Sequence, residues 1–179
     1  MNVLVLVGSL RTGSTNRQLA EIVDAHLPAG ASATVYGHLD TLPFYSEDAD
    51  NDAAPEAVRD FRDAVQQADA LVVVTPEYNG TMSGVIKNAI DWASRPFGAG
   101  SIAGKPVAVL AASGSSRGAQ WAREDAVKAL RIAGGKPLER TFGLGSAHTA
   151  LTDGELADDA VAAELRDLLG DLHGSLASA

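Results

Sequence analysis

The sequence contains no cysteine among its 179 residues. This absence excludes disulfides, thiolate nucleophiles, thiolate metal sites and iron–sulfur clusters. Any redox chemistry has to come from a bound organic cofactor or from a metal held without thiolates. We predict no metal site, because the 4 histidines are scattered and none has a second histidine or a carboxylate at a recognised ligand spacing: His26, His38, His148 and His173.

Positive charge is also scarce. The chain has 14 lysines and arginines against 23 aspartates and glutamates, a formal net charge of −9. Nucleic-acid binding needs clustered basic side chains, so we predict no nucleic-acid partner. No apolar run is long enough to cross a bilayer, and the sequence opens on a strand-like pattern instead of a basic segment followed by an apolar signal core. We therefore expect no membrane partner and a cytoplasmic location.

The overall composition is that of an ordinary globular protein, with 46% apolar and 21% charged residues. A length of 179 residues suits one domain and leaves little room for two. We therefore predict that residues 1–179 form a single domain.

Short apolar runs rich in valine alternate with segments of helical periodicity. Strands are predicted at 3–7, 33–36, 70–74, 106–111 and 136–141. Helices are predicted at 16–27, 55–68, 83–94, 119–133 and 158–176. The acidic segment 47–52 predicts a solvated loop. The alternation predicts an α/β fold with a parallel sheet and helices on both faces. We expect a flavodoxin-like three-layer sandwich with a five-stranded sheet, for which the strand order is 2-1-3-4-5.

Three loops rich in glycine and small polar residues follow the first, third and fourth predicted strands, at 8–16, 75–80 and 112–118. These strands are neighbours in the predicted order, and such sheets bind ligands at the carboxyl ends of their strands, so we expect one pocket. The first loop leads directly into a helix, whose unpaired N–H groups and dipole attract anions. Further donors for a phosphate come from Ser9, Arg11, Ser14, Thr15 and Asn16.

The glycine spacing within the first loop allows a choice among three kinds of phosphate ligand: a dinucleotide, a nucleoside triphosphate and a ligand with a single terminal phosphate. A dinucleotide fingerprint needs three glycines, whereas this loop has Gly8 and Gly13 alone. The loop matches a P-loop in its glycine spacing and final hydroxyl, but Ser14 stands where the lysine for the β and γ phosphates is required. Triphosphate hydrolysis is thus a minor alternative, and a single terminal phosphate, as in FMN, suits the loop.

Two motifs resemble the NADPH-dependent FMN reductase family, which includes bacterial quinone, chromate and azo-dye reductases. The first is GSLR at 8–11 with Ser14 and Asn16, and the second is TPEYN at 75–79 continuing to KNAIDW at 87–92. The similarity extends through 113–118 and covers nearly the whole chain. It implies FMN as cofactor, NADPH or NADH as co-substrate, and hydride transfer through FMN to a quinone-type or other small electron acceptor.

The resemblance also implies how the loops share the cofactor. The first loop would hold the FMN phosphate, residues 76–80 would run along the isoalloxazine, and the third loop would approach the ring from the other side. The flavin carries the chemistry, so no catalytic side chain is expected. The helices after the second and third loops would pack against a partner subunit in a homodimer or tetramer. The cofactor-binding residues implied are Ser9, Arg11, Ser14, Thr15, Asn16, Pro76, Glu77, Tyr78, Asn79, Gly80, Ser113, Gly114, Ser115, Arg117 and Gly118.

The chain departs from the pattern of that family at three positions. Gly80 stands where an aromatic residue is often found, Ser83 where a proline is, and Arg117 where a glycine pair is common. Arg117 is either a contact for the extra phosphate of NADPH or an exposed loop cation, so the choice between NADPH and NADH stays open. Local or packing roles are expected for two polar helix residues and two tryptophans: Asn88, Asp91, Trp92 and Trp121.

Two other functions stay open beside the quinone-type reductase. One is a flavin reductase that supplies reduced FMN to a partner monooxygenase, and it predicts readily exchanged flavin. The other is a non-enzymatic, flavodoxin-like electron carrier, which would not oxidise NADPH by itself.

Overall fold

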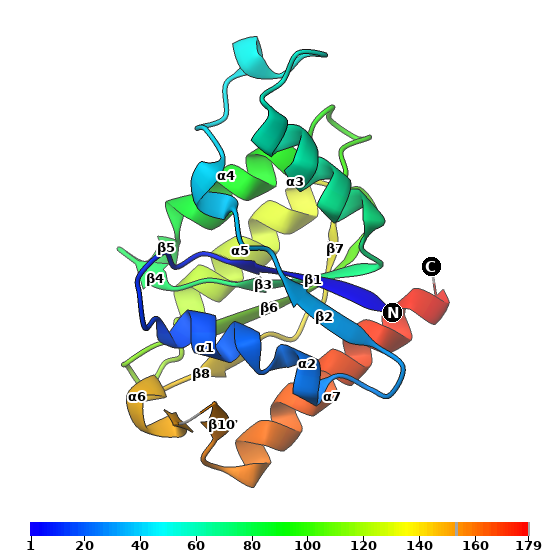
Figure 1. The fold of residues 1–179 in the computed structure, drawn as a ribbon. Helices are drawn as coiled ribbons and strands as arrows, with labels where there is room; N and C mark the ends of the chain where they lie inside the picture. The colour runs from blue at the N-terminus through cyan, green and yellow to red at the C-terminus, as the bar shows by residue number, and fades with distance from the viewer. Residues whose placement is uncertain (153, 179) are drawn as a thin grey trace.

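The computed structural model describes residues 1–152 and 154–178, and a parallel sheet lies at its centre (Figure 1). Its strands are β1 (Asn2–Val7), β2 (Ser32–Val35), β3 (Ala70–Val74), β6 (Pro106–Ala112), β7 (Lys136–Pro137) and β8 (Phe142–Leu144). The order is β2-β1-β3-β6-β7, with β8 also paired to β6, and all of these pairs are parallel. With β7 and β8 sharing the last position, this confirms the predicted order 2-1-3-4-5.

The last strand position differs from its prediction, because a continuous strand over 136–141 is wrong. β7 pairs with the start of β6 at Pro106 and Val107, whereas β8 pairs with its end at 110–112. Between them the chain leaves the sheet edge, where Glu139 forms an ion pair with Arg131 at 2.8 Å and Arg140 one with Asp171 at 2.7 Å. These exposed charged side chains interrupt the strand, since charge is readily solvated at an edge.

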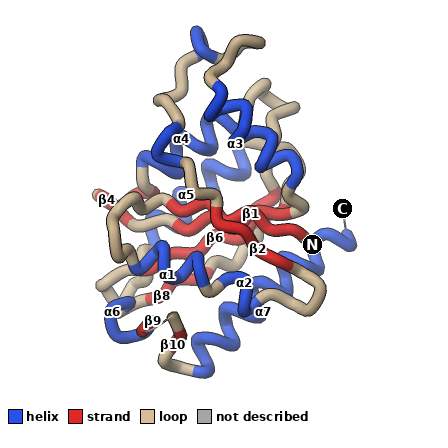
Figure 2. The backbone as a smooth tube through the Cα atoms, in the orientation of Figure 1, coloured by secondary structure: helices blue, strands red, loops and turns tan. Residues whose placement is uncertain are grey.

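Helices cover both faces of the sheet, as predicted (Figure 2). The helices on one face are α3 (Glu56–Gln67), α4 (Gly84–Ala93) and α5 (Gln120–Ile132). Those on the other face are α1 (Thr15–Glu21), α2 (Val23–His26) and α7 (Asp159–Ser175).

Alternating side chains of the strands supply two cores, one on each face of the sheet. In β1, Leu4 and Leu6 pack with Phe61 of α3 in the first core. Val5, on the opposite face of the same strand, packs with Leu165 of α7 in the second. This burial on both faces is the reason that the valine-rich runs read as continuous apolar strands.

Several short elements were not predicted. The helix expected over 16–27 consists of α1 and α2 with Ile22 between them. The remaining elements are the hairpin β4 (Glu77–Tyr78) and β5 (Thr81–Met82), α6 (Ala147–Ala150), the antiparallel pair β9 (Leu151–Thr152) and β10 (Glu155–Leu156), and the 3₁₀ turns η1 (Leu39–Thr41), η2 (Glu47–Ala49) and η3 (Leu176–Ser178). None of the helices within 1–152 and 154–178 is long and apolar enough to cross a membrane.

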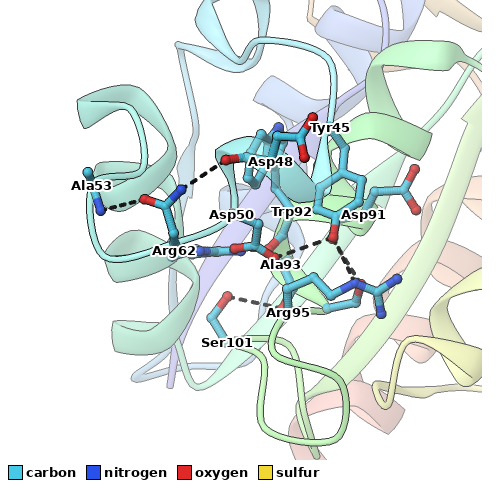
Figure 3. A network of polar contacts seen from close by, with 12 residues as sticks. Tyr45, Asp48, Asp50, Ala53, Arg62, Asp91, Trp92, Ala93, Arg95 and Ser101 are labelled. Carbon is cyan, nitrogen blue, oxygen red and sulfur yellow. Dashed lines mark hydrogen bonds and ion pairs between the residues drawn. The ribbon is translucent and has the colours of Figure 1, made fainter.

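The acidic segment 47–52 is only partly the solvated loop that we expected. Asp50 pairs with Arg62 of α3 at 2.7 Å, and the Arg62 Nε donates to the Trp92 carbonyl at 2.9 Å. The Tyr45 hydroxyl lies between Asp50 and Arg95, and it accepts a hydrogen bond from the Arg95 Nε at 3.1 Å (Figure 3). This network anchors the segment to α3 and α4.

The preceding residues are anchored to α4 by two of the residues expected to have packing roles. The Asn88 Nδ2 and the Trp92 Nε1 both donate to the Pro43 carbonyl, at 3.0 and 2.8 Å. The Asn88 Oδ1 accepts from the Tyr45 N–H at 2.9 Å. Trp92 is fully buried in the core, whereas Trp121 is 53% exposed. Asp91 bonds locally, to Lys87 at 2.6 Å.

Candidate functional site

The three glycine-rich loops leave neighbouring strands at the same edge of the sheet, although β6 continues to Ala112, beyond the level at which β1 and β3 end. Val7 at the end of β1 is in register with Val74 of β3, and Val74 with Leu110 of β6. The Gly8 N–H donates to the Val74 carbonyl at 2.8 Å, and the Thr75 N–H donates to the Leu110 carbonyl at 3.0 Å. The loops therefore begin side by side at the carboxyl edge, where a parallel sheet of this order binds its ligands (Figure 1).

Gly8 lets the first loop pass close to the start of α4. A Cβ atom on Gly8 would lie 2.3 Å from the Ser83 Oγ and 2.6 Å from the Ile86 Cγ1. Ser83, which stands where the family often has proline, caps α4 by accepting from the Ile86 N–H at 3.3 Å. The Ser83 side chain is thus used to cap α4. Gly8 is required here because the space beside Ser83 and Ile86 leaves no room for a Cβ atom.

The first loop presents donors that have no protein acceptor. Ser9 and Asn16 are 8% and 4% exposed, yet within the described part of the chain their backbone N–H groups donate to no acceptor. Buried N–H groups are rarely left unpaired in native proteins. Ser14 is 2% exposed and its side chain does not cap α1. The Asn16 N–H belongs to the first turn of α1, where the helix itself offers no acceptor. Together these donors fit an anionic ligand such as a phosphate.

Arg11 gives the loop a permanent positive charge. Its guanidinium is exposed, donates to the Thr12 carbonyl at 3.3 Å, and has no ion-pair partner among the residues described. Beside it lies a cavity of about 310 Å³, also lined by Arg17 and Tyr36. Burial and the charge of Asp60 raise the pKa of the Tyr36 phenol.

Asn16 uses its side chain differently from the expected phosphate contact. The Nδ2 donates to the Ala112 carbonyl at 2.9 Å, and the Oδ1 accepts from the Ala112 N–H at 2.8 Å. Both functional atoms of the amide are thus engaged at the end of β6. The side chain therefore has a structural contact that the sequence did not predict, while its role as a phosphate ligand stays a prediction, as does that of the Asn16 backbone N–H.

The second loop folds back as the hairpin β4–β5. Asn79 and Gly80 have φ values of +53° and +77°, which is the pattern of a type I′ turn between Tyr78 and Thr81. The Asn-Gly pair in the sequence carried this signal, although we predicted only a tight turn from it. The Glu77 carboxylate accepts from the Ala122 N–H at 3.2 Å, so that the hairpin is tied to the first turn of α5.

The third loop is held against residues that the sequence did not point to. The Ser113 N–H donates to the Leu144 carbonyl at 2.9 Å, and the Ala147 N–H donates to the Ser113 carbonyl at 2.9 Å. The Ser146 N–H donates to the Ser115 carbonyl at 3.2 Å. Gly114, Ser115 and Arg117 are exposed, whereas Gly118 is buried. The two glycines that flank Leu144, at 143 and 145, were the available signal for this packing.

Comparison with known proteins assigns the chain to a family. Residues 1–149 match the profile of the family described as NADPH-dependent FMN reductase. The chain belongs to this family. Its description names the cofactor and the co-substrate that the sequence motifs implied, FMN and NADPH.

Relatives carry related names. A 2-hydroxy-1,4-benzoquinone reductase from a Burkholderia species is 45% identical over 113 residues, which cover 63% of this chain and 61% of that protein. An NAD(P)H-dependent FMN reductase from Pseudomonas aeruginosa is 38% identical over 161 residues, covering 89% of this chain and 86% of the relative. The chain therefore spans about three fifths of the length of the quinone reductase, 61%, and most of that of the FMN reductase, 86%.

A solved structure has the same fold over almost its entire length. The flavoenzyme NAD(P)H:(acceptor) oxidoreductase FerB from Paracoccus denitrificans superimposes with a TM-score of 0.88 at 32% identity. The match covers 99% of this chain and 97% of that chain. The similarity thus includes all three loops.

Two departures from the FMN reductase family pattern meet at one aromatic side chain. A Cβ atom on Gly80 would lie 3.6 Å from the Trp121 Cε3, and the Arg117 Cζ lies 5.4 Å from the Trp121 ring centroid. Trp121 therefore provides an aromatic surface beside the position that often carries one in the family. Arg117 is exposed, and its guanidinium lies over the Trp121 ring in a cation–π contact.

An apolar cavity of about 490 Å³ adjoins the first two loops of this FMN reductase family member. It is lined by Leu10 and Tyr78 from the loops and by Phe44 from the anchored segment. These side chains are 60%, 53% and 88% exposed. Exposed apolar surface of this kind, gathered at a site, marks a binding surface for a ligand or for another protein.

Proposed function

We propose that the protein is an FMN-dependent NAD(P)H oxidoreductase that reduces quinone-type or other small electron acceptors. The observation that carries the proposal is the meeting of three glycine-rich loops at adjacent strand ends, with unpaired N–H donors in the first loop. The family match and the name of the Burkholderia relative support a quinone-type acceptor. Residues 1–179 would act as one FMN-binding domain, and a cytoplasmic location stays a prediction.

Bound FMN supplies the hydride chemistry in this proposal, and the protein residues bind and orient it. The backbone N–H groups of Ser9 and Asn16, the Ser14 and Thr15 hydroxyls and the Arg11 guanidinium would hold the phosphate. Each hydrogen bond to a charged group contributes about 1.5–3 kcal/mol, so several of them suffice without a metal. Residues 76–80 and 113–118 would flank the ring, and no side-chain acid or base is required.

The test begins with the visible spectrum of the purified protein and of the protein after FMN is added. Oxidation of NADPH and NADH is then measured with and without a benzoquinone. Flavin absorbance together with quinone-dependent oxidation supports the proposal. A flavin-bound protein that oxidises neither donor would instead be an electron carrier, and Mg-ATP turnover without any flavin binding would restore the triphosphate alternative.

A homodimer or tetramer is the second part of the proposal, and the face formed by α4 and α5 supports such an assembly. A cavity of about 640 Å³ opens there, with Phe97 and Ile132 on its rim at 74% and 64% exposure. Charged side chains of both signs surround the cavity: Lys87, Asp91, Asp125 and Lys128. Lys87 and Asp91 pair with each other at 2.6 Å, so the exposed apolar rim is what supports contact with a second copy. Sedimentation of the native chain and of Ile132→Glu tests this, since a buried glutamate would dissociate the dimer.

A further inference from the structure

Arg123, in the first turns of α5, contacts the end of the third loop. Its Nε donates to the Gly118 carbonyl at 2.9 Å, and its Nη2 donates to the Arg117 carbonyl at 3.4 Å. Its Nη1 donates to the Thr141 hydroxyl. One rigid guanidinium therefore holds two consecutive carbonyls of the loop and joins them to the segment between β7 and β8.

The backbone around Arg123 leaves space for this contact. A Cβ atom on Gly143 would stand 2.6 Å from the Arg123 Cζ. Gly118 has a φ of +56°, and a Cβ atom there would stand 2.6 Å from the Gly143 carbonyl carbon. Two glycines from distant parts of the chain are thus needed where the guanidinium crosses β8.

Arg123 has no carboxylate within ion-pair distance in the part of the chain that the structure describes. The side chain is half-buried, and this desolvation lowers the pKa of the guanidinium, while the more distant charges of Glu124, Glu164 and Glu77 raise it. An arginine keeps its charge even so. Its positive charge is therefore not neutralised by direct pairing.

The contact determines which way the neighbouring N–H groups point. In a trans peptide the N–H is opposite to the carbonyl, so the carbonyls of Arg117 and Gly118 turn the N–H groups of Gly118 and Ala119 away from Arg123. The Gly118 N–H reaches the Ser115 carbonyl at 3.4 Å. The Ala119 N–H donates to no acceptor within 1–152 and 154–178, although Ala119 is 1% exposed and adopts a strained left-handed conformation with φ of +54°.

The same turn of α5 also holds the second loop. The N–H of Ala122, next to Arg123, donates to the Glu77 carboxylate at 3.2 Å. Adjacent residues of one helix therefore set the positions of the two loops that would flank a flavin ring.

We propose that Arg123 is a positioning residue of the flavin site, which orients the third loop so that the Ala119 N–H faces the ligand and whose unpaired charge raises the reduction potential of bound FMN. The inference rests on the proposed function. A positive charge and a donor N–H on this side favour the more negative, reduced ring, and no carboxylate is paired with Arg123 to neutralise that charge within the described residues.

The experiment compares three variants: Arg123→Gln, which removes the charge, Arg123→Lys, which keeps the charge but not the fork, and Arg131→Gln as a control on the same helix. FMN affinity is measured by fluorescence titration of the apoprotein, and the midpoint potential by equilibration with reference dyes. We expect Arg123→Gln to bind FMN about tenfold more weakly, since hydrogen bonds to charged groups are lost, and to have a lower potential. Arg123→Lys should restore the potential more fully than the affinity, and Arg131→Gln should match the native chain.

Native affinity and native potential in Arg123→Gln would overturn the inference. Thermal unfolding of the apoproteins distinguishes a positioning role from a general loss of stability. A general loss would lower FMN affinity without the selective recovery of the midpoint potential in Arg123→Lys. If Arg123→Gln does not fold, Arg123→Lys carries the test: a native FMN affinity in this variant overturns the positioning role. A native chain that binds no FMN at all would overturn both the inference and the proposed function, whereas a native chain with normal quinone reduction and an unaffected Arg123→Gln overturns the inference alone.

Discussion

Replacing Asn16 by alanine tests whether its side chain ties the first loop to β6 or binds phosphate. The substitution removes two hydrogen bonds, at 2.9 and 2.8 Å, and leaves the N–H and carbonyl of Ala112 without partners in a residue that is 3% exposed. Each buried group left unpaired costs about 1–3 kcal/mol, so we expect the loss of both partners to lower the free energy of unfolding by about 2–6 kcal/mol. A loss of this size is a large part of the stability of a typical domain, about 5–15 kcal/mol.

Urea unfolding of the apoprotein, with no FMN present, measures this loss directly. Thr15→Ala is the matched control, because Thr15 is the neighbouring loop residue and its hydroxyl would contact the phosphate. We expect Thr15→Ala to weaken FMN binding while changing the stability of the apoprotein by less than about 0.5 kcal/mol. Asn16→Ala should instead lower the stability of the apoprotein more than it lowers FMN affinity. If Asn16→Ala leaves the urea midpoint unchanged and lowers FMN affinity instead, the structural assignment of this side chain is refuted.

Three further changes have defined outcomes. Arg11→Ala should weaken FMN binding by about 1.5–3 kcal/mol, the contribution of a hydrogen bond to a charged group, with apoprotein stability unchanged; equal affinity in a fluorescence titration would contradict a phosphate role. Gly143→Ala places a methyl group 2.6 Å from the Arg123 Cζ, so we expect a loss of about 1–3 kcal/mol in urea unfolding, and an unchanged midpoint would mean that the guanidinium lies elsewhere. The raised pKa of Tyr36 stabilises the fold below pH 10.0, and this contribution is lost as the pH rises through the folded pKa, because the unfolded chain releases the proton first. Tyr36→Phe should therefore reduce the alkaline decline of the unfolding free energy, and an identical decline in both proteins would rule out this source.

Local patterns in the sequence were sufficient to predict the strands of the sheet and the three loops that leave its carboxyl edge. Valine-rich runs such as 70–74 are buried on both faces, and this burial produces the continuous apolar pattern that predicts a parallel strand. The prediction of one continuous strand over 136–141 was wrong because the edge of a sheet accepts exposed charges such as Glu139. Such charges give no periodic signal in the sequence that marks where the strand is interrupted.

The tertiary structure alone decided what the individual site residues contact. Asn16 is a short polar residue of the kind that donates to a phosphate, yet its side chain bonds to the backbone of Ala112, 96 residues away. Arg123 and Gly143 carry no motif, and their roles follow from a contact between α5 and β8.

The sequence by itself thus determined the alternation of strands and helices and the tight turn at Asn79-Gly80, because each depends on periodicity or on backbone preferences of neighbouring residues. The strand order and the shared edge of the three loops were predicted from the fold class that this alternation favours, and the structure confirms the order. Only the fold decided which donors stay free for a ligand and which are used within the protein. The reason is physical: a side chain with several hydrogen-bonding atoms can satisfy them with any group that the packing brings within reach, and packing joins residues that are remote in the chain.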